Sequence, residues 1–394
     1  MRILYGVVGE GMGHATRSRV VIEHLLDQGH ELLVVVSGRA HAFLADVLAQ
    51  AAVRAPGAVE VREIAGLHLI YDEDGVDRSE SVWSNVAAAP ASLRTNVGLY
   101  AEVVGRFTPD AVISDFESWA YLFARVRDIP VVSIDNMQVL NRCAHPAAMK
   151  RTETGRRDAD WTVAKWSVKV KLPGAWHYIV SSFFFPPVRK PRTTLVPPIL
   201  RPQILAAKRE RGEHVLVYQT AANNQPLLAL LSALPHRFLV YGMGTERSPD
   251  LGANVELRPF SQDGFIDDLR TARAVVAGGG YSLMGEAVHL GVPMLALPLA
   301  SQYEQMLNAR YLTELGYGDW APELTEEALN AFLSALDGYE AALATYPRQG
   351  NAMLLGCVDE VLRRIGLGEP RRDALDAPSM GDRVSAKIDA ALEE

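Results

Sequence analysis

The sequence predicts an α/β protein with two doubly wound, mostly parallel sheets. Short apolar runs rich in β-branched residues alternate with helix-spaced stretches, this alternation occurs twice, and proline-rich segments separate the two sets. Continuous apolar runs are typical of parallel strands that are buried on both faces. The predicted strands cover, in chain order, residues 3–8, 31–37, 111–114, 131–134, 214–218, 238–241, 274–277 and 293–296.

The length of 394 residues favours two domains, because a single compact core rarely grows so large. Proline-rich segments precede the strand that begins at His214, as expected of a linker. Sheets of this class bind ligands beyond the carboxyl ends of their strands, so we expect the two domains to face each other across a cleft. The predicted division is an N-terminal domain at 1–196, a linker at 197–212, a C-terminal domain at 213–350, and a C-terminal helix with a peripheral tail at 351–394.

Composition excludes several classes of protein. The net charge of −8 argues against nucleic acid as a partner, and no apolar run is long enough to cross a bilayer. Cys143 and Cys357 lie far apart and in no metal-ligand spacing, so we expect neither a disulfide scaffold nor a metal site. The first strand begins without a basic leader segment, which favours a cytoplasmic protein.

The segment 147–171 combines seven lysines and arginines with Trp161 and Trp166. The first interpretation of such a segment is a solvated helix face. The alternative is a surface that contacts a membrane or an anionic acceptor, which would place the protein peripherally at the inner face of a membrane.

The stretch "GEGMGHATRS" follows the first predicted strand. Its glycines, Gly9, Gly11 and Gly13, precede a helix, and a helix N-terminus with accessible amides suits an anion. His14 stands where a dinucleotide fingerprint needs glycine, so nicotinamide and flavin cofactors are not expected. A histidine at a helix start tends to be neutral and can accept a proton, which makes His14 the candidate general base. Glu10 is a second candidate, and a merely capping or packing His14 is the alternative.

Asp115 directly follows a buried strand and therefore belongs to the same sheet edge as the first glycine loop. If it lies against His14, it would orient the imidazole ring and stabilise the imidazolium. Capping of the following helix is the alternative role for Asp115.

A second glycine loop follows the strand at 274–277. Gly278, Gly279 and Gly280 precede a helix from about Ser282 and offer backbone amides to a phosphate. Glu286 lies about one turn into that helix, where it could accept hydrogen bonds from ribose hydroxyls. Further candidates for contact with a donor molecule are Thr220, Phe260, Phe265, Tyr281, Ser282, Glu304, Gln305 and Asn308, with Phe260 and Phe265 equally suited to the core.

The order of glycine loop, glutamate, "GVPML..P" and "EQ..NA" resembles the donor-binding signature of GT-B glycosyltransferases. The resemblance is to plant-type family 1 enzymes and the lipid II N-acetylglucosaminyltransferase. "GEGMGHATRS" and "SFFFPP" are closest to a less characterised bacterial and archaeal branch. The resemblance implies the GT-B fold, His14 as base with Asp115 as its partner, Glu286 on the ribose, and Glu304 with Gln305 on the donor sugar. Gly278, Tyr281 and Ser282 replace the plant-type histidine, tryptophan and asparagine, which favours the family 28-like arrangement.

The resemblance implies an inverting, metal-independent transfer of a sugar from a nucleotide diphosphate to an acceptor hydroxyl, with no cofactor. Uridine is implied as the first choice of base and thymidine as the next. Small-molecule, glycan and lipid-linked acceptors all stay open. The alternatives are a nucleotide-sugar 2-epimerase of the same fold and a non-catalytic nucleotide-sugar binding protein.

Overall fold

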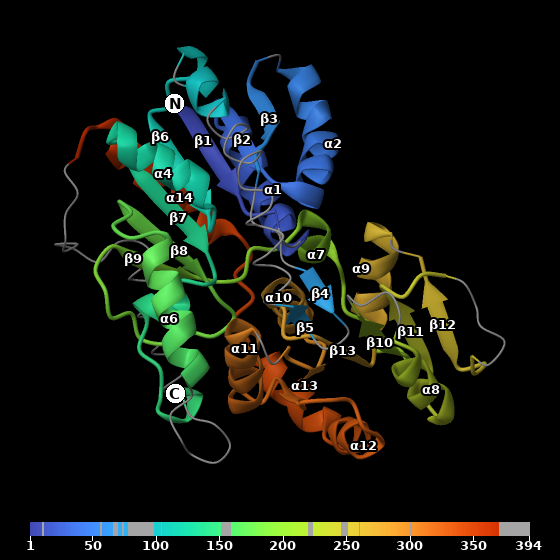
Figure 1. Cartoon of the computed structure of the whole chain (residues 1–394). Coiled ribbons are helices and arrows are strands. Elements are labelled where there is room, and N and C mark those ends of the chain that lie inside the picture. Colours follow the sequence, from blue (N-terminus) through green and yellow to red (C-terminus); the bar gives the residue numbers. More distant parts are fainter. Residues whose placement is uncertain are drawn as a thin grey trace. The chain divides into compact units, whose positions relative to one another are not determined.

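The structure is a computed structural model of the chain, and its contacts divide the chain into two compact units (Figure 1). The residues that it describes are 1–9, 12–55, 57–65, 70–72, 75–77, 98–103, 105–150, 159–219, 224–245, 251–259, 261–299 and 302–369. Unit 1 comprises Met1–Ile70, Arg78–Ile199 and Gln349–Glu394, and unit 2 comprises Tyr71–Asp77 and Leu200–Arg348. Four candidate site residues lie outside the described residues: Glu10, Gly11, Thr220 and Phe260.

Unit 1 contains a parallel sheet of seven strands in the order β3-β2-β1-β6-β7-β8-β9. The strand order reverses at β1, which pairs with β2 on one side and with β6 on the other. In chain order the strands are β1 (Arg2–Val7), β2 (Glu31–Val36), β3 (Val59–Glu63), β6 (Ala111–Asp115), β7 (Val131–Asp135), β8 (His177–Ser181) and β9 (Thr193–Val196). Such a reversal is where ligands bind in doubly wound sheets.

Helices of unit 1 cover this sheet. They are α1 (Met12–Asp27), α2 (Gly38–Arg54), α4 (Ser118–Arg127), α5 (Val139–Arg142), α6 (Ala159–Lys171) and α14 (Ala352–Gly366), with a short 3₁₀ turn, η1 (Ala148–Lys150). The C-terminal helix α14 packs on β8 and β9, and its buried residues Leu354, Val358 and Leu362 recur every four positions within the core of this unit. The chain therefore returns to its first unit after completing the second.

Unit 2 contains a parallel sheet of six strands in the order β12-β11-β10-β13-β14-β15, again with a reversal, here at β10. The strands are β10 (Val215–Tyr218), β11 (Phe238–Tyr241), β12 (Val255–Arg258), β13 (Ala274–Ala277), β14 (Met294–Ala296) and β15 (Gly318–Trp320). The helices are α7 (Pro202–Ala206), α8 (Gln225–Ala233), α9 (Gln262–Thr271), α10 (Tyr281–Leu290), α11 (Tyr303–Glu314), α12 (Glu326–Ser334) and α13 (Leu336–Ala344). A separate pair of short strands joins β4 (Ile70–Asp72) to β5 (Gly75–Asp77).

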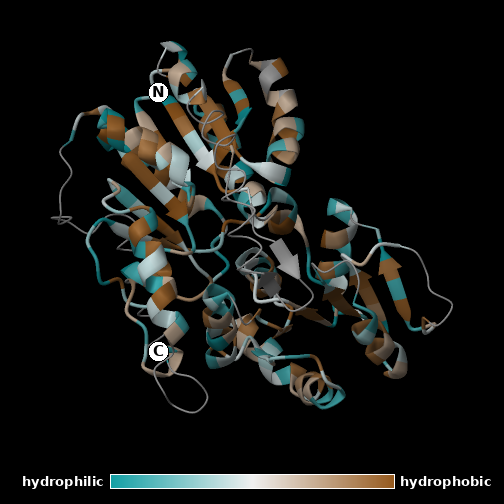
Figure 2. Cartoon of the chain, viewed as in Figure 1, coloured by the Kyte–Doolittle hydropathy of each residue, from teal (hydrophilic) through white to brown (hydrophobic). Residues whose placement is uncertain are grey.

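The central strands of both sheets are their most apolar parts, as Figure 2 shows. Every residue of β6, β7 and β13 is buried. The predicted α/β architecture with two parallel sheets is confirmed, because continuous apolar runs formed strands that are covered on both faces. Among the described residues, no helix has both the length and the hydropathy needed to span a bilayer.

Candidate functional site

His14 and Asp115 are in contact in unit 1. His14 is the third residue of α1, so the helix begins earlier than the sequence indicated, and Asp115 ends β6. The Nδ1 atom of His14 lies 2.9 Å from Oδ1 of Asp115. The His14 side chain is 23% exposed and that of Asp115 only 1%, so solvent reaches the imidazole but not the carboxylate. The pair lies where the strand order of the sheet reverses, between β1 and β6.

Arg17 holds the same carboxylate from the next turn of α1. Its Nε donates to Oδ2 of Asp115 at 2.9 Å, and its Nη2 donates to Oδ1 at 2.5 Å. The Ser18 hydroxyl donates to Oδ2 at 2.8 Å. Burial alone raises the pKa of Asp115, but the charges and hydrogen bonds of Arg17 and His14 outweigh it and hold that pKa well below its usual range. Asp115 is therefore a buried carboxylate that stays ionised.

The tautomer of His14 decides what its ring can do. Nδ1 lies 2.9 Å from Oδ1 of Asp115 and 2.7 Å from Nη2 of Arg17. A guanidinium only donates, so Arg17 could bond to Nδ1 only where that atom carries no proton. When Nδ1–H donates to Asp115 instead, Nε2 carries no proton and can accept one. Because Nη2 also donates to Oδ1, Arg17 can satisfy Asp115 without competing for Nδ1.

A third strand end adds polar groups to this cluster. Nη1 of Arg17 donates to Oδ1 of Asn136, directly after β7, at 2.5 Å. The neighbouring Asp135 is fully buried and accepts hydrogen bonds from the Ser133 hydroxyl and the Gln138 amide. Burial raises the pKa of Asp135 to about 6, and the charge of Asp115 adds to this effect. Arg17, Asp135 and Asn136 were not among the predicted site residues, although "SIDN" shows the same pattern as Asp115, with polar residues directly after a buried strand.

Asp115 does not cap the helix that follows it, which was its alternative role. Glu117 is the N-cap of α4, and its carboxylate accepts hydrogen bonds from the backbone amides of Trp119 at 2.7 Å and Ala120 at 2.6 Å. The carboxylate of Asp115 instead contacts side chains of α1. Of the first glycine loop, Gly13 lies in the first turn of α1, and Gly9 packs so closely on Ser37 that a Cβ atom would lie 1.9 Å from its carbonyl oxygen.

The second glycine loop is held by neutral side chains. Gly278, Gly279 and Gly280 connect β13 to α10, and Gly280 is the N-cap without a side chain to cap the first turn. Oε1 of Gln305 accepts hydrogen bonds from the amides of Gly279 at 3.2 Å and Leu299 at 3.1 Å. A Cβ atom on Gly279 would lie 2.6 Å from the backbone oxygen of Gln305, so only glycine fits.

Gln305 and Asn308 therefore have internal contacts in addition to their predicted role toward a sugar. Asn308 is 2% exposed, and its Nδ2 donates to the carbonyl of Gly279 at 3.1 Å and to Oε1 of Glu304 at 3.2 Å. The half-buried Glu304 and Gln305 lie in the first turn of α11. In the structure these three side chains tie the start of α11 to the glycine loop, and contact with a donor sugar stays a prediction.

Glu286 forms an ion pair that the sequence did not indicate. Arg201, the N-cap residue of α7, donates through Nε to Oε1 at 2.7 Å and through Nη2 to Oε2 at 2.6 Å. Burial raises the pKa of Glu286, whereas Arg201 lowers it. A carboxylate oxygen has a second lone pair, so this arrangement is compatible with a further hydrogen bond from a hydroxyl. No local pattern connects two residues that are 85 positions apart.

The remaining candidates lie around α9 and the start of α10. Phe265 is buried, with its ring centroid 5.0 Å from that of Tyr241 and 5.8 Å from that of Tyr218. It thus fills the core, the second of the two roles expected for it. Tyr281 is buried and Ser282 is half-buried, both in the first turn of α10. Among the described residues, no group of three or more potential ligands is arranged to hold a metal ion.

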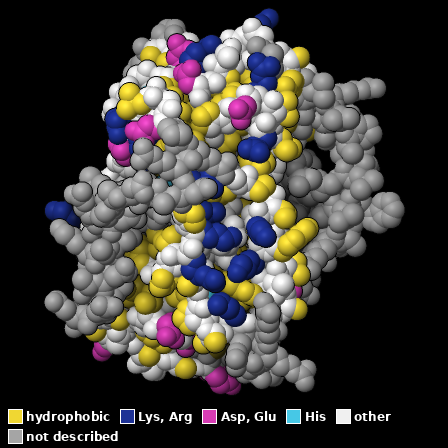
Figure 3. All heavy atoms as spheres, turned by 90° about the vertical axis from the view of Figure 1, so that its left-hand side faces the viewer, with side chains coloured by type: hydrophobic (Ala, Val, Ile, Leu, Met, Phe, Trp, Pro, Cys, Tyr) yellow, Lys and Arg dark blue, Asp and Glu magenta, His cyan; other side chains and the backbone are white. Residues whose placement is uncertain are grey.

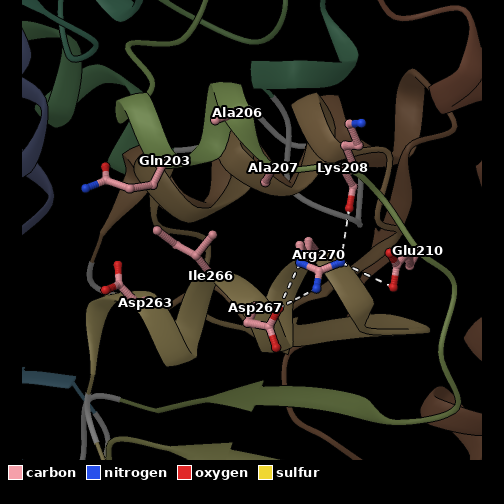
Figure 4. A pocket seen from close by; sticks show the side chains of 9 residues that line it. All are labelled: Gln203, Ala206, Ala207, Lys208, Glu210, Asp263, Ile266, Asp267 and Arg270. Carbon is pink, nitrogen blue, oxygen red and sulfur yellow. Dashed lines mark hydrogen bonds and ion pairs between the residues drawn. The ribbon is translucent and has the colours of Figure 1, made fainter.

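A hollow of about 520 Å³ lies elsewhere on unit 2, between α7 and α9 (Figure 4). Its main cation, Arg270, is paired with Asp267 and Glu210. None of the predicted donor-binding residues lines it, so this hollow is not a candidate for the donor site.

Solved structures share this fold. The calicheamicin glycosyltransferase CalG4 is similar with a TM-score of 0.62 at 19% sequence identity, over 92% of this chain and 99% of that one. UGT89C1 of Arabidopsis thaliana, solved in complex with UDP, is similar with a TM-score of 0.63 at 14% identity, over 92% and 99% of the two chains. Two doubly wound units of this kind define the GT-B fold of glycosyltransferases.

A family model described as "Glycosyl transferase family 1" matches residues 1–337. The chain therefore belongs to this family and is a glycosyltransferase. A relative from Methanosarcina mazei, described as an uncharacterised glycosyltransferase, is 24% identical over 343 residues, which cover 81% of this chain and 85% of the relative. The predicted GT-B fold and membership in the family 1 glycosyltransferases are thus confirmed, and the particular branch stays a prediction.

Proposed function

We propose that this glycosyltransferase moves a sugar from a nucleoside diphosphate donor to an acceptor hydroxyl with inversion at the anomeric carbon and without a metal ion. The observation that carries the proposal is the contact of the half-exposed His14 with the buried, ionised Asp115. A base of this kind removes a proton from an attacking hydroxyl. The proposal assigns this role to His14 rather than to Glu10.

Each residue of the cluster in unit 1 has a part in the step. The acceptor hydroxyl gives its proton to Nε2 of His14, and its oxygen forms the new bond to the anomeric carbon. Asp115 accepts Nδ1–H and stabilises the imidazolium that results. Arg17 is a positioning residue, because it keeps the carboxylate fixed and ionised through two hydrogen bonds. The step as proposed assigns no metal ion to the leaving diphosphate, whose charge the start of α10 would meet instead.

The leaving group in this step is the nucleoside diphosphate, which takes the electron pair of the broken glycosidic bond. The amides and the helix dipole at the start of α10 would meet the charge that grows on it. Glu286 is assigned to the ribose, and Glu304 with Gln305 to the donor sugar. UDP-sugars are the first choice of donor and dTDP-sugars the next, and the acceptor is a small molecule, a glycan or a lipid-linked molecule.

The donor can be identified before any acceptor is known. A ligand that binds only the folded protein raises its stability by about 2.7 kcal/mol at roughly one hundred times its Kd. We expect UDP and UDP-sugars to raise the melting temperature more than dTDP compounds, and both more than GDP or ADP. The measurement is a thermal-shift series with and without EDTA. A series in which no nucleoside diphosphate raises the melting temperature would contradict the proposed donor.

Product analysis separates the alternatives. The donor sugar is incubated with a panel of acceptors in EDTA, and the anomeric configuration of donor and product is compared by NMR. Inversion in EDTA supports the proposal, whereas retention or a requirement for a divalent metal ion contradicts it. A donor sugar altered at C2 without acceptor consumption would identify a 2-epimerase. Donor binding without transfer or hydrolysis would identify a binding protein.

A further inference from the structure

Helix α6 exposes an apolar face in addition to the one that it buries. Trp161 and Val168 are buried, and α6 packs there against α5. On another side, Val163, Trp166 and Val170 are 59%, 63% and 47% exposed. These three residues are spaced by three and four positions, so they share one face of the helix. This face therefore leaves a tryptophan and two valines in contact with water.

Cationic side chains surround this face. Lys165 and Lys169 lie on α6 itself, and Arg189 and Lys190 lie on a neighbouring segment. This segment is close to α5, because Nζ of Lys190 donates to Asn141 and Val188 forms an antiparallel bridge with Cys143. Burial lowers the pKa of Lys190, and the charges of Arg142, Lys165, Lys169 and Arg189 lower it further. Since α5, which Lys190 contacts, packs against α6, these cations belong to neighbouring elements.

Figure 3 shows the side of Figure 1 on which α6 lies, and Lys and Arg side chains gather there beside hydrophobic ones. The protein as a whole carries a net charge of −8, so composition does not account for a concentration of positive charge. Val188, next to Arg189 in the chain, is also 42% exposed. Together, Val163, Lys165, Trp166, Lys169, Val170 and Val188–Lys190 form what we call the α6 surface.

We propose that the α6 surface docks on an anionic lipid bilayer. Lysine and arginine near such a membrane are attracted by its negative surface potential. Tryptophan prefers the boundary between headgroups and acyl chains, where its ring is buried and its N–H is hydrated. A helix with apolar residues on one side and flanking cations lies in the plane of that boundary. A nucleic acid would use the cations but not the valines, so the membrane explains more of the surface.

Vesicle sedimentation tests this proposal without a donor or an acceptor, so its outcome is independent of the proposed reaction. The full chain is mixed with vesicles of phosphatidylcholine alone, or of equal parts of phosphatidylcholine and phosphatidylglycerol, at low and high salt. We expect binding to the anionic vesicles only, and weaker binding at high salt because salt screens the attraction. Wild-type protein that stays in solution with both kinds of vesicle would overturn the proposal.

Three variants locate the contact. The double variant Lys169→Glu/Arg189→Glu should lower the affinity for anionic vesicles at least roughly twentyfold, since each cation contributes about fivefold. Trp166→Ser keeps every charge and should lower it roughly tenfold. Arg106→Glu is the matched control, because its side chain is 82% exposed and its carbonyl accepts a hydrogen bond from Arg2 at the start of β1, away from the α6 surface. Its binding should equal that of the wild type.

The same variants distinguish a membrane from a nucleic acid as the partner. Unchanged vesicle binding in both α6 variants would overturn the proposal. So would binding to short RNA that is as tight as vesicle binding and is weakened by Lys169→Glu/Arg189→Glu but not by Trp166→Ser. All substituted side chains are exposed or half-exposed, and equal melting temperatures of the variants will establish that each is folded.

Discussion

The cluster around Asp115 and the loop around Gly279 occupy equivalent places in their two sheets but are built from different groups. In each unit the residues follow a strand at or next to the reversal of strand order. In unit 1, charged side chains are buried and paired: Arg17 and Asp115 are 4% and 1% exposed. In unit 2, backbone groups of the loop are held by the neutral amides of Gln305 and Asn308.

This difference matches the two tasks that the proposed function assigns to the two units. A buried charge network fixes the protonation state of its members, which suits a proton transfer. A loop without side chains fixes the positions of backbone amides, which suits an anionic ligand. Substitutions in the first cluster should therefore change turnover and the pH dependence of stability. Substitutions in the glycine loop of unit 2 should change the shape of that loop and the binding of the donor.

The largest effect is expected for His14→Ala. If His14 is the base as proposed, its loss should lower kcat by roughly 10²–10⁴-fold and leave the KM for the donor nearly unchanged, because its proposed contact is with the acceptor hydroxyl. Steady-state kinetics with the donor found by thermal shift measure both constants. His24→Ala is the matched control: His24 lies on the same helix and also contacts a carboxylate, Oδ1 of Asp359 at 2.7 Å. Equal kcat values for the two variants would remove His14 from the reaction.

The next largest effect is expected on the free energy of unfolding, in the variant Arg17→Met. Arg17→Met leaves the charge of Asp115 buried without its guanidinium, and breaking such a pair costs about 3–5 kcal/mol. Equilibrium unfolding in urea gives this value. Because the pKa of Asp115 is lower in the folded than in the unfolded state, its stabilising contribution is present above the unfolded pKa and is lost as the pH falls. The variant should lose this dependence together with the stability.

A double-mutant cycle separates the pair from other effects of the change. Asp115→Asn removes the charge that Arg17 compensates, so the cost of Arg17→Met should be much smaller in that background. Additive costs would show that Arg17 does not stabilise the protein through the charge of Asp115. Arg17→Lys keeps the charge but not the two parallel hydrogen bonds. This variant should be less stable than the wild type and more stable than Arg17→Met.

The next prediction concerns the pH dependence of stability. Titration of Asp135 should change the free energy of unfolding by about 3 kcal/mol as the pH rises. Its folded-state pKa is about 6, above the ordinary value of 3.8, so its contribution is fully present below that ordinary value and is lost as the pH rises through about 6. In Asp135→Asn residue 135 does not titrate, so this part of the pH dependence is absent from the variant. The difference in unfolding free energy between variant and wild type should therefore shift in favour of the variant between pH 4 and pH 7. A constant difference would contradict the buried titration.

The sequence predicts four neighbouring strands around the reversal of each sheet, and it misses the strands beyond them, including the fully buried β8. Predicted strands at 238–241 and 274–277 coincide with β11 and β13, because both are continuous apolar runs covered on two faces. The edge strand β3, with the sequence VEVRE, was not predicted, because it is partly exposed and carries three charged residues. Only its pairing with β2 makes it a strand.

The candidate site follows the same division between local and long-range information. His14 and Asp115 could be selected because each follows a strand, which is a local pattern. Arg17 resembles any surface arginine of an amphipathic helix, and its burial depends on contacts with Asp115 and Asn136, roughly one hundred positions away. The pairing of Glu286 with Arg201 likewise arises only when α7 and α10 meet in the fold.

The smallest effect is expected for Gly279→Ala, in the glycine loop of unit 2. In Gly279→Ala the new Cβ would lie 2.6 Å from the backbone oxygen of Gln305 and 2.7 Å from its Cβ, so the start of α11 must shift. Such overpacking costs about 1–3 kcal/mol. Because the loop amides move with it, the KM for the donor should rise while kcat changes little. Urea unfolding and steady-state kinetics measure the two effects.

Gly338→Ala is the control within the same unit, because Gly338 lies inside α13 and a Cβ atom there would have no neighbour within 4 Å. Replacing a glycine inside a helix by alanine stabilises by about 0.5–1 kcal/mol, so the two substitutions should change stability in opposite directions. A Gly279→Ala protein as stable as Gly338→Ala would mean that the loop yields to the methyl group. The second region would then be a flexible loop, and the contrast with the rigid charge network around Asp115 would be one of mobility as well as of charge.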